Sequence, residues 1–247
     1  PFDLGWKIAA SNLADVAAMG AAPTALVVSL VVPQSTPIRV LCEIADGLRA
    51  ACEQLAPGCG VEGGDLATGA TIMAAATAFG DLQGRQPVTR AGARASDVVA
   101  VSGALGAAAK GIADLFLLAT IDGEPDAALA SALRASSSDV RAQLQPTPPI
   151  GDGVLAAIAG ATSMLDVSDG LVLDARRIAR ASGVTIDLHA AEIGDQAALH
   201  GGEDHALLAT FPSGGVLPGG FRAIGRVLTV ADQPGVTVNG RPDDAAG

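Results

Sequence analysis

The segment that most constrains the fold runs from Met164 to Leu171 and reads MLDVSDGL. Its first half continues an apolar run typical of a buried strand, and helical spacing begins after its second half. A strand that leads through a polar turn into a helix is a unit of α/β architecture. Asp166 and Asp169 share this turn, where their like charges repel each other. A divalent cation would offset the repulsion, because hard cations take carboxylate oxygens as ligands.

A second interpretation explains the same turn without a ligand. Ser168 or Asp169 could cap the helix that begins near Gly170, as such residues commonly do. One cap suffices, so this interpretation leaves Asp166 without a role. Asp174 lies one helical turn further on, and we expect it on a solvated face beside two arginines.

Other acidic residues lie beside glycines or small residues and are candidates for the same site. Asn12 and Asp15 are three residues apart, so they share a helix face at the edge of its apolar stripe. A carboxylate there is costly unless it is paired or metal-bound, and a bond to a backbone group or an arginine is an equal alternative. The segment 63–65, GGD, reads first as a turn. Its glycines would also let backbone amides approach a phosphate closely.

The segment 201–205, GGEDH, precedes an apolar run that predicts a strand. Its simplest interpretation is a tight turn with solvated acids at Glu203 and Asp204. We expect His205 to be a half-buried strand residue and not a catalytic base. The chain contains no GxxxxGK[ST] motif, which excludes a P-loop enzyme.

Composition narrows the possible partners. The 247 residues include 26 acids and 15 bases, for a formal charge of -11. An acidic chain gains nothing from counterion release on nucleic acid, and aromatic residues make up only 2% of it, too few for stacking platforms. We therefore expect no nucleic-acid partner. An anionic substrate would need help from metal ions.

The predicted location is the cytoplasm. Cys42, Cys52 and Cys59 are odd in number and match no zinc spacing, so they are expected as reduced thiols. No apolar run approaches the roughly 20 residues of a membrane span, and no signal peptide is recognisable. Because the chain opens at Pro1 within what reads as a connected fold, we expect a further N-terminal segment before it.

Apolar periodicity predicts helices and strands in alternation. The expected helices cover 5–20, 37–56, 105–119, 153–161 and 170–181, and the expected strands cover 25–32, 70–79, 98–101, 164–167, 184–188, 205–211 and 221–228. Such alternation in both halves predicts an α/β fold or α+β layers. The polar, turn-rich segment 80–97 predicts a boundary between two domains, 1–88 and 89–247.

Six motifs taken together resemble thiamine-monophosphate kinase. They are NLADVAAMGA at 12–21, GGD at 63–65, RAGARASD at 90–97, GALG at 103–106, DVSDGL at 166–171 and GGEDHALL at 201–208. This family is part of the ATP-binding superfamily of aminoimidazole ribonucleotide synthetase and selenophosphate synthetase. The resemblance implies a homodimer in which the N-terminal domains form a barrel and a C-terminal α/β domain packs beside each.

The resemblance also implies the chemistry and its residues. The ATP γ-phosphoryl group would pass to thiamine monophosphate, giving thiamine diphosphate and ADP, with several Mg²⁺ ions in the site and a monovalent cation as an open requirement. The implied metal ligands are Asp15, Asp65, Asp166 and Asp169, with Asp166 and Asp169 catalytic. The implied ATP contacts are Gly64, Asp65, Arg90 and Ser168, and Glu203 or Asp204 would place the substrate.

The chain departs from the family pattern at several points. Ala14 replaces a serine, Leu66 replaces a threonine, and GGEDHAL replaces GGEDYEL. A loop is shortened between Ile193 and Gly194, a C-terminal aromatic is not visible, and an acidic GDD-type stretch is expected before Pro1. Two alternatives therefore stay open: a sister ATP-dependent synthetase of the selenophosphate or aminoimidazole ribonucleotide type, and a non-catalytic nucleotide- or metal-binding module.

Overall fold

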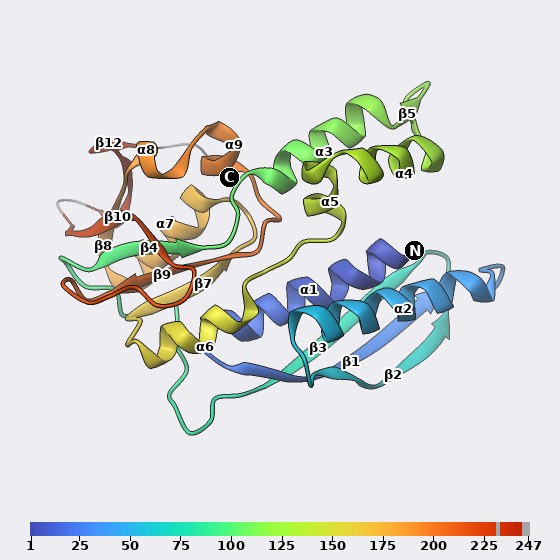
Figure 1. The fold of residues 1–247 in the computed structure, drawn as a ribbon, viewed down its shortest axis with the longest axis horizontal. Coiled ribbons are helices and arrows are strands. Elements are labelled where there is room, and N and C mark those ends of the chain that lie inside the picture. The colour runs from blue at the N-terminus through green and yellow to red at the C-terminus, as the bar shows by residue number, and fades with distance from the viewer. Residues whose placement is uncertain (231–232, 244–247) are drawn as a thin grey trace.

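The N-terminal part is a three-stranded sheet covered on one face by two helices. The computed structural model describes residues 1–230 and 233–243 (Figure 1). The helices are α1 (Phe2–Ala18) and α2 (Ile38–Leu55), and the strands are β1 (Ala22–Val32), β2 (Gly60–Thr68) and β3 (Met73–Asp81). The sheet order is β2-β1-β3, with β1 parallel to β2 and antiparallel to β3. The outer face is open, since every β2 residue after Gly60 is exposed.

Small residues explain how α1 and α2 come together. A Cβ atom on Gly5 would lie 2.0 Å from the carbonyl oxygen of Ile44, and one on Gly47 would lie 2.0 Å from that of Phe2. Only glycine permits so close an approach of two backbones. The buried stripe of α1 is similarly rich in alanine, around Leu13. This close packing fixes the helix that carries Asp15.

The C-terminal part is built on a seven-stranded sheet with the order β12-β11-β8-β10-β4-β9-β7. Its strands are β4 (Val98–Ser102), β7 (Ser163–Val167), β8 (Val184–Leu188), β9 (Ala206–Phe211), β10 (Arg222–Thr229), β11 (Gly235–Val238) and β12 (Arg241–Pro242). All neighbours pair antiparallel except β11 and β8. Strand β7 therefore lies at one edge, beside β9.

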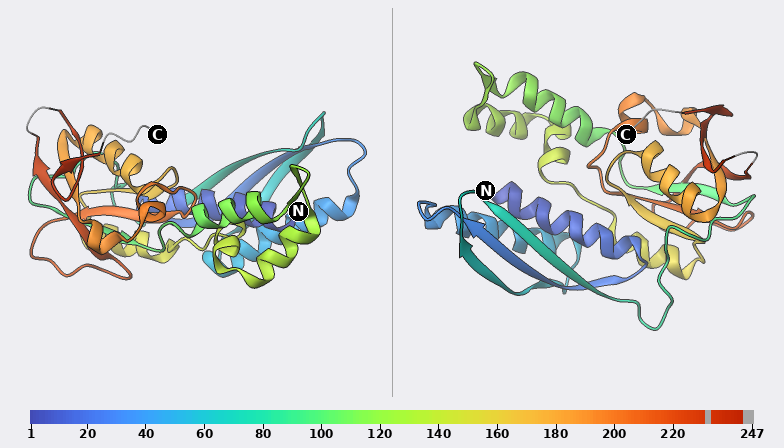
Figure 2. Two further views of the ribbon diagram at one scale, coloured as in Figure 1. Left: turned by 90° about the horizontal axis from the view of Figure 1, so that it is seen from above. Right: turned by 180° about the vertical axis from the view of Figure 1, so that it is seen from behind.

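The described residues contain seven further helices and a small two-stranded β-ribbon. They are α3 (Ala107–Leu118), α4 (Ala127–Ser136), α5 (Ser138–Leu144), α6 (Ile150–Ile158), α7 (Leu171–Ser182), α8 (Ala190–Ile193) and α9 (Gln196–His200), with the ribbon β5 (Thr120–Ile121) and β6 (Glu124–Pro125). Figure 2 shows the first sheet and the seven-stranded sheet at opposite ends of the molecule, with α1 reaching between them. No helix among the described residues is both long and apolar enough to cross a membrane.

Alternation along β7 and β9 sends neighbouring side chains to two separate cores. Met164 and Leu207 pack in the core that contains α1, whereas Leu165 and Leu208 pack in the core that contains α7. Asp166, two residues after Met164, therefore lies on the face of the sheet that meets α1. This topology brings Asp15 and Asp166 together although about 150 residues separate them in the chain.

The mixed α/β fold is confirmed, and most predicted elements begin and end close to their expected limits. One assignment was wrong: the GGD segment is not a turn but lies inside strand β2. Strands β11 and β12 and the short helices α8 and α9 were not predicted. The two larger sheets fall on either side of residue 88, and the division into domains 1–88 and 89–247 stays a prediction.

Candidate active site

Two carboxylates border a cleft between α1 and the edge of the large sheet. The cleft has a volume of about 380 Å³, and its lining includes Asp15, Met19, Arg90, Met164 and Asp166. The pKa of the Asp15 carboxyl is raised above its ordinary value, mainly by desolvation and next by the negative charge of Asp166. His205 and Arg90 act in the opposite direction. An Asp15 carboxyl whose ionisation is made more costly by a neighbouring carboxylate suits a cation.

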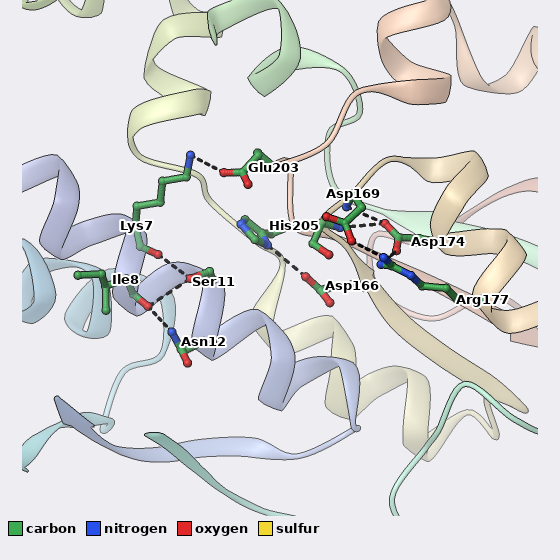
Figure 3. A network of polar contacts seen from close by, with 11 residues as sticks. Lys7, Ile8, Ser11, Asn12, Asp166, Asp169, Asp174, Arg177, Glu203 and His205 are labelled. Atoms are coloured by element: carbon green, nitrogen blue, oxygen red, sulfur yellow. Dashed lines mark hydrogen bonds and ion pairs between the residues drawn. The ribbon is translucent and has the colours of Figure 1, made fainter. Parts of the chain in front are cut away.

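The turn from β7 to α7 is held by a buried acid. The Asp174 side chain is 1% exposed, and its Oδ2 accepts hydrogen bonds from the backbone amides of Ser168 and Asp169, both at 3.0 Å. Arg177 bridges to Asp174 and Asp169, each at 2.5 Å (Figure 3). Burial raises the pKa of Asp174, and the Asp169 amide and Arg177 oppose that shift. The expectation of a solvated Asp174 was wrong, because the side chain folds back onto the turn.

Capping does not explain the acids of this turn. Gly170 is the N-cap residue of α7, and no side chain caps the helix there. Gly170 has a φ of 115°, and a Cβ on it would lie 2.6 Å from the carbonyl oxygen of His200. Glycine is therefore required at this position. Asp166 and Asp169 remain available for another role, with Asp169 half-exposed beside Arg177.

The GGED turn lies directly against this first turn. The Glu203 amide donates to the carbonyl of Ser168 at 2.8 Å, and the His205 amide donates to that of Val167 at 3.0 Å. A Cβ on Gly202 would lie 2.5 Å from the Ser168 carbonyl oxygen. The glycine thus permits the two turns, which are distant in sequence, to pack backbone against backbone.

The three side chains after Gly202 each hold a different element. Glu203 forms an ion pair of 2.5 Å with Lys7 of α1. Asp204 is buried and accepts from the amides of Gly106 (2.6 Å) and Ala108 (2.9 Å) at the start of α3. His205 Nδ1 lies 3.1 Å from Asp166 Oδ2. Glu203 therefore stays half-exposed, as expected, whereas the expectation of a solvated Asp204 was wrong, because that side chain is buried against the start of α3.

The structure separates the remaining predicted residues. Asp65 is exposed on β2, where its Oδ1 accepts from the amide of Leu66 at 2.9 Å. Gly64 packs against Val28, and neither Gly64 nor Asp65 lines the cleft, whereas Arg90 does. Within residues 1–230 and 233–243, no three Asp, Glu, His or Cys side chains gather into a metal-binding cluster. Asp15 and Asp166 meet at the cleft, and Ser168 and Asp169 follow along the adjoining turn.

His205 is the site residue that the sequence did not reveal. It is buried, lies just before β9 and contacts Asp166, whereas we expected a half-buried strand residue and not a catalytic base. The available signal was its position directly after GGED and before an apolar strand.

Comparisons with known proteins identify the family. The family described as "AIR synthase related protein, N-terminal domain" matches residues 1–82. Thiamine-monophosphate kinase of Mycobacterium tuberculosis is 43% identical over 92% of this chain and 68% of its own length. The enzyme of Corynebacterium glutamicum is 34% identical over 97% of this chain and 73% of its own length.

A solved structure agrees with these relatives. "AaThiL complexed with AMPPCP and TMP" superimposes with a TM-score of 0.82 at 29% identity, covering 100% of this chain and 80% of that one. Similarity therefore extends across both sheets and both turns of the cleft. The chain belongs to the thiamine-monophosphate kinase family.

Proposed function

We propose that this protein transfers the γ-phosphoryl group of ATP to thiamine monophosphate, giving thiamine diphosphate and ADP. The observation that carries the proposal is the pairing of Asp15 and Asp166 across one cleft, in a chain of this family. A relative of the same fold was solved with AMPPCP and TMP, an ATP analogue and the acceptor. Phosphoryl transfer depends mainly on positioning and on charge neutralisation, which a cleft with carboxylates and an arginine can support.

Magnesium is part of this proposal, and the residues of the cleft fit it. Mg²⁺ is usually held by one or two carboxylates together with substrate phosphates, not by an all-protein cage. A pair such as Asp15 and Asp166 meets that requirement. We propose Asp65 and Asp169 as further ligands. When bound, the ions would neutralise charge on the phosphate oxygens.

The residues of the chain then need only to bind and orient two anions. The acceptor is itself a phosphate with a second pKa of roughly 6, so it is already deprotonated at neutral pH and requires no general base. Arg90 is exposed at the cleft, where a guanidinium can hold ATP phosphates. We propose Gly64 and Ser168 as further ATP contacts, and Glu203, fixed by Lys7, as the contact to thiamine monophosphate.

We also propose a homodimer and a cytoplasmic location. The open face of the first sheet exposes apolar side chains, among them Met73 (62%) and Phe79 (49%). A second copy could cover them and pair with the β2 edge, as the barrel of the family implies. All three cysteines are free thiols, which suits a reducing compartment.

The test is a product assay with the full-length protein. Thiamine monophosphate, ATP and saturating Mg²⁺ are incubated with the enzyme, and thiamine diphosphate is separated by chromatography and quantified. We expect thiamine diphosphate and ADP in equal amounts. Selenide and a purine-ribotide precursor serve as alternative acceptors in parallel reactions. ATP consumption with one of these, and none with thiamine monophosphate, would overturn the proposal.

A further inference from the structure

We propose that His205 is a positioning residue that holds the Asp166 carboxylate in its metal-binding orientation. Nothing in the proposed chemistry uses this histidine, yet its side chain is buried and faces Asp166 (Figure 3). The inference rests on the proposed function through the metal role of Asp166. Because the partner is a carboxylate, Nδ1–H of His205 donates to Asp166 Oδ2 across 3.1 Å.

The backbone fixes the histidine relative to its partner. The His205 amide donates to the carbonyl of Val167, the residue after Asp166, at 3.0 Å. In the adjoining ladder Ala206 pairs with Val167 and Leu207 with Asp166. His205 also adopts a φ of 53°, a conformation that few residues other than glycine, asparagine, aspartate and histidine favour. The backbone of His205 is thus anchored to β7, the strand that carries the carboxylate.

Asp166 needs such a partner. Within the described residues, His205 is the one side chain that forms a hydrogen bond or ion pair with this carboxylate. Asp15 carries a like charge across the cleft and would drive the carboxylate away. A single donor on Oδ2 fixes the group and leaves Oδ1 without a protein partner on the cleft side. That arrangement is the one that a metal ligand requires.

Asp174 shows the opposite arrangement. Its two oxygens accept two backbone amides and the Arg177 guanidinium, so the protein itself satisfies this carboxylate. Of the two buried acids at the turn, only Asp166 combines one anchoring donor with access to the cleft. The contrast supports a metal-directed role for the His205 contact and not a general need to neutralise buried charge.

Three variants test the contact. His205→Asn places an amide nitrogen near the position of Nδ1 and tolerates a positive φ. His205→Gln carries the same group but reaches towards the position of Nε2, and His205→Phe keeps a ring without a donor. Mn²⁺ affinity is measured by calorimetry on the full-length protein with the ATP analogue AMPPCP present. The kcat and the KM for thiamine monophosphate are measured with Mg²⁺.

We expect His205→Phe and His205→Gln to weaken Mn²⁺ binding and lower kcat by about 10- to 100-fold, as lost outer-sphere partners do. His205→Asn should retain most of both, and the KM for thiamine monophosphate should change little in all three. A folded His205→Phe with wild-type Mn²⁺ affinity and kcat would overturn the inference. If His205→Phe does not fold, equal losses in the Asn and Gln variants would overturn it, because both carry an amide and only the Asn variant places its nitrogen near the position of Nδ1.

The inference and the proposed function can fail separately. If the wild-type protein makes no thiamine diphosphate but Mn²⁺ affinity still falls in the Gln variant and not in the Asn variant, the function is wrong and the positioning role stands. If the wild-type protein is an active kinase and all variants bind Mn²⁺ equally, the positioning role is wrong.

Discussion

The β7–α7 turn and strand β2 both carry aspartates beside glycines, and the fold treats them in opposite ways. In the turn, Asp174 is buried and ties the backbone to Arg177, so the neighbouring acids are held in place. In β2 every residue after Gly60 is exposed, and among the described residues the Asp65 side chain bonds to no group but the amide that follows it. One half of the predicted site is thus built within a single chain.

The difference between the turn and β2 indicates what has to hold the second half of the predicted site, which is Asp65 on β2. The exposed strand has few contacts of its own to hold Asp65 in a fixed position, so whatever covers the open sheet face would supply them. In the proposed homodimer that cover is a second copy. The turn should therefore tolerate few substitutions in the isolated protomer, whereas β2 should be sensitive mainly to its pairing with β1.

The largest expected effect is on catalysis. Asp166→Asn removes a charged ligand from the cleft, which we expect to cost roughly 4 kcal/mol of transition-state stabilisation, or about a thousandfold in kcat. The fold should persist, because the carboxamide still accepts from His205. Turnover and circular dichroism are measured together. Asp65→Asn is the matched variant on β2, and we expect a similar loss if both acids hold metal.

A thousandfold loss of kcat in Asp166→Asn together with wild-type kcat in Asp65→Asn would show that the two regions do not share the metal site. It would restrict the metal site to the turn and remove Asp65 from the proposed ligands. Near-normal turnover in Asp166→Asn would refute the metal site at the cleft.

The second effect is on stability and concerns the acid that holds the turn. Asp174→Asn presents an amide group to two backbone donors and leaves Arg177 with half of its partners. Breaking a buried, charge-assisted network of this kind costs roughly 3 kcal/mol, which for a chain of this size lowers Tm by roughly 6 to 12 °C. Thermal unfolding followed by circular dichroism measures the shift.

Asp169→Asn is the control within the same turn. Its carboxylate is half-exposed, so loss of the pair with Arg177 should cost less than about 1 kcal/mol. Turnover should nevertheless fall strongly, because we propose Asp169 as a metal ligand. A loss confined to thermal stability would show that Asp169 is structural.

The turn and the strand also differ in what their sequences reveal. Apolar periodicity identified most helices and strands, including β7 and α7, because their buried faces follow a regular pattern. It failed at GGD, where the glycines do not form a turn and Gly64 allows β2 to lie close to β1. The spacing of apolar residues along a chain does not show which other strand lies beside a given segment. The same limit explains why β11 and β12, short strands at the end of the sheet, were not predicted.

For the site, the structure brings Asp15, Arg90 and Asp166, which the sequence assigned to one site, to the same cleft, and their roles stay predictions. The sequence misjudged Asp174, whose arginine neighbours suggested a solvated face, because the side chain bonds to amides five and six residues earlier. His205 was missed for a related reason. Its contact with Asp166 exists only through the pairing of β9 with β7.

The third effect tests the pairing of β2 with β1. A Cβ on Gly64 would lie 1.9 Å from the carbonyl oxygen of Val28, so Gly64→Ala must displace one backbone from the other. We expect a cost of about 2 kcal/mol and a fall in Tm of roughly 4 to 8 °C. A Cβ on Gly63 would meet nothing within 4 Å, so Gly63→Ala should remain within about 0.5 kcal/mol of the wild type. Equal Tm values for the two variants would contradict the observed register.

The smallest effect concerns Asp15 and pH. Its pKa is raised in the folded protein, mainly by desolvation and next by Asp166, above the value of 3.8 expected when unfolded. The folded state therefore holds the Asp15 proton more tightly than the unfolded state does. The ionised carboxylate lowers stability at neutral pH, and this cost declines as the pH falls through the folded pKa and disappears below about 3.8.

Asp15→Asn should accordingly be more stable than the wild type at pH 7 when EDTA removes metal ions. Solvent screens the exposed side of this carboxylate, so we expect a gain in Tm of no more than about 2 °C. The gain should shrink towards zero as the pH approaches 4, which thermal melts over a pH series would measure. Asp65→Asn is the control on the exposed strand, where the carboxamide oxygen still accepts from the Leu66 amide; because this side chain is already exposed to solvent, the change should bring no gain. If Asp15→Asn lowers Tm at pH 7 without metal, the carboxylate is stabilised by the protein, and the cleft does not need a cation to offset its charge.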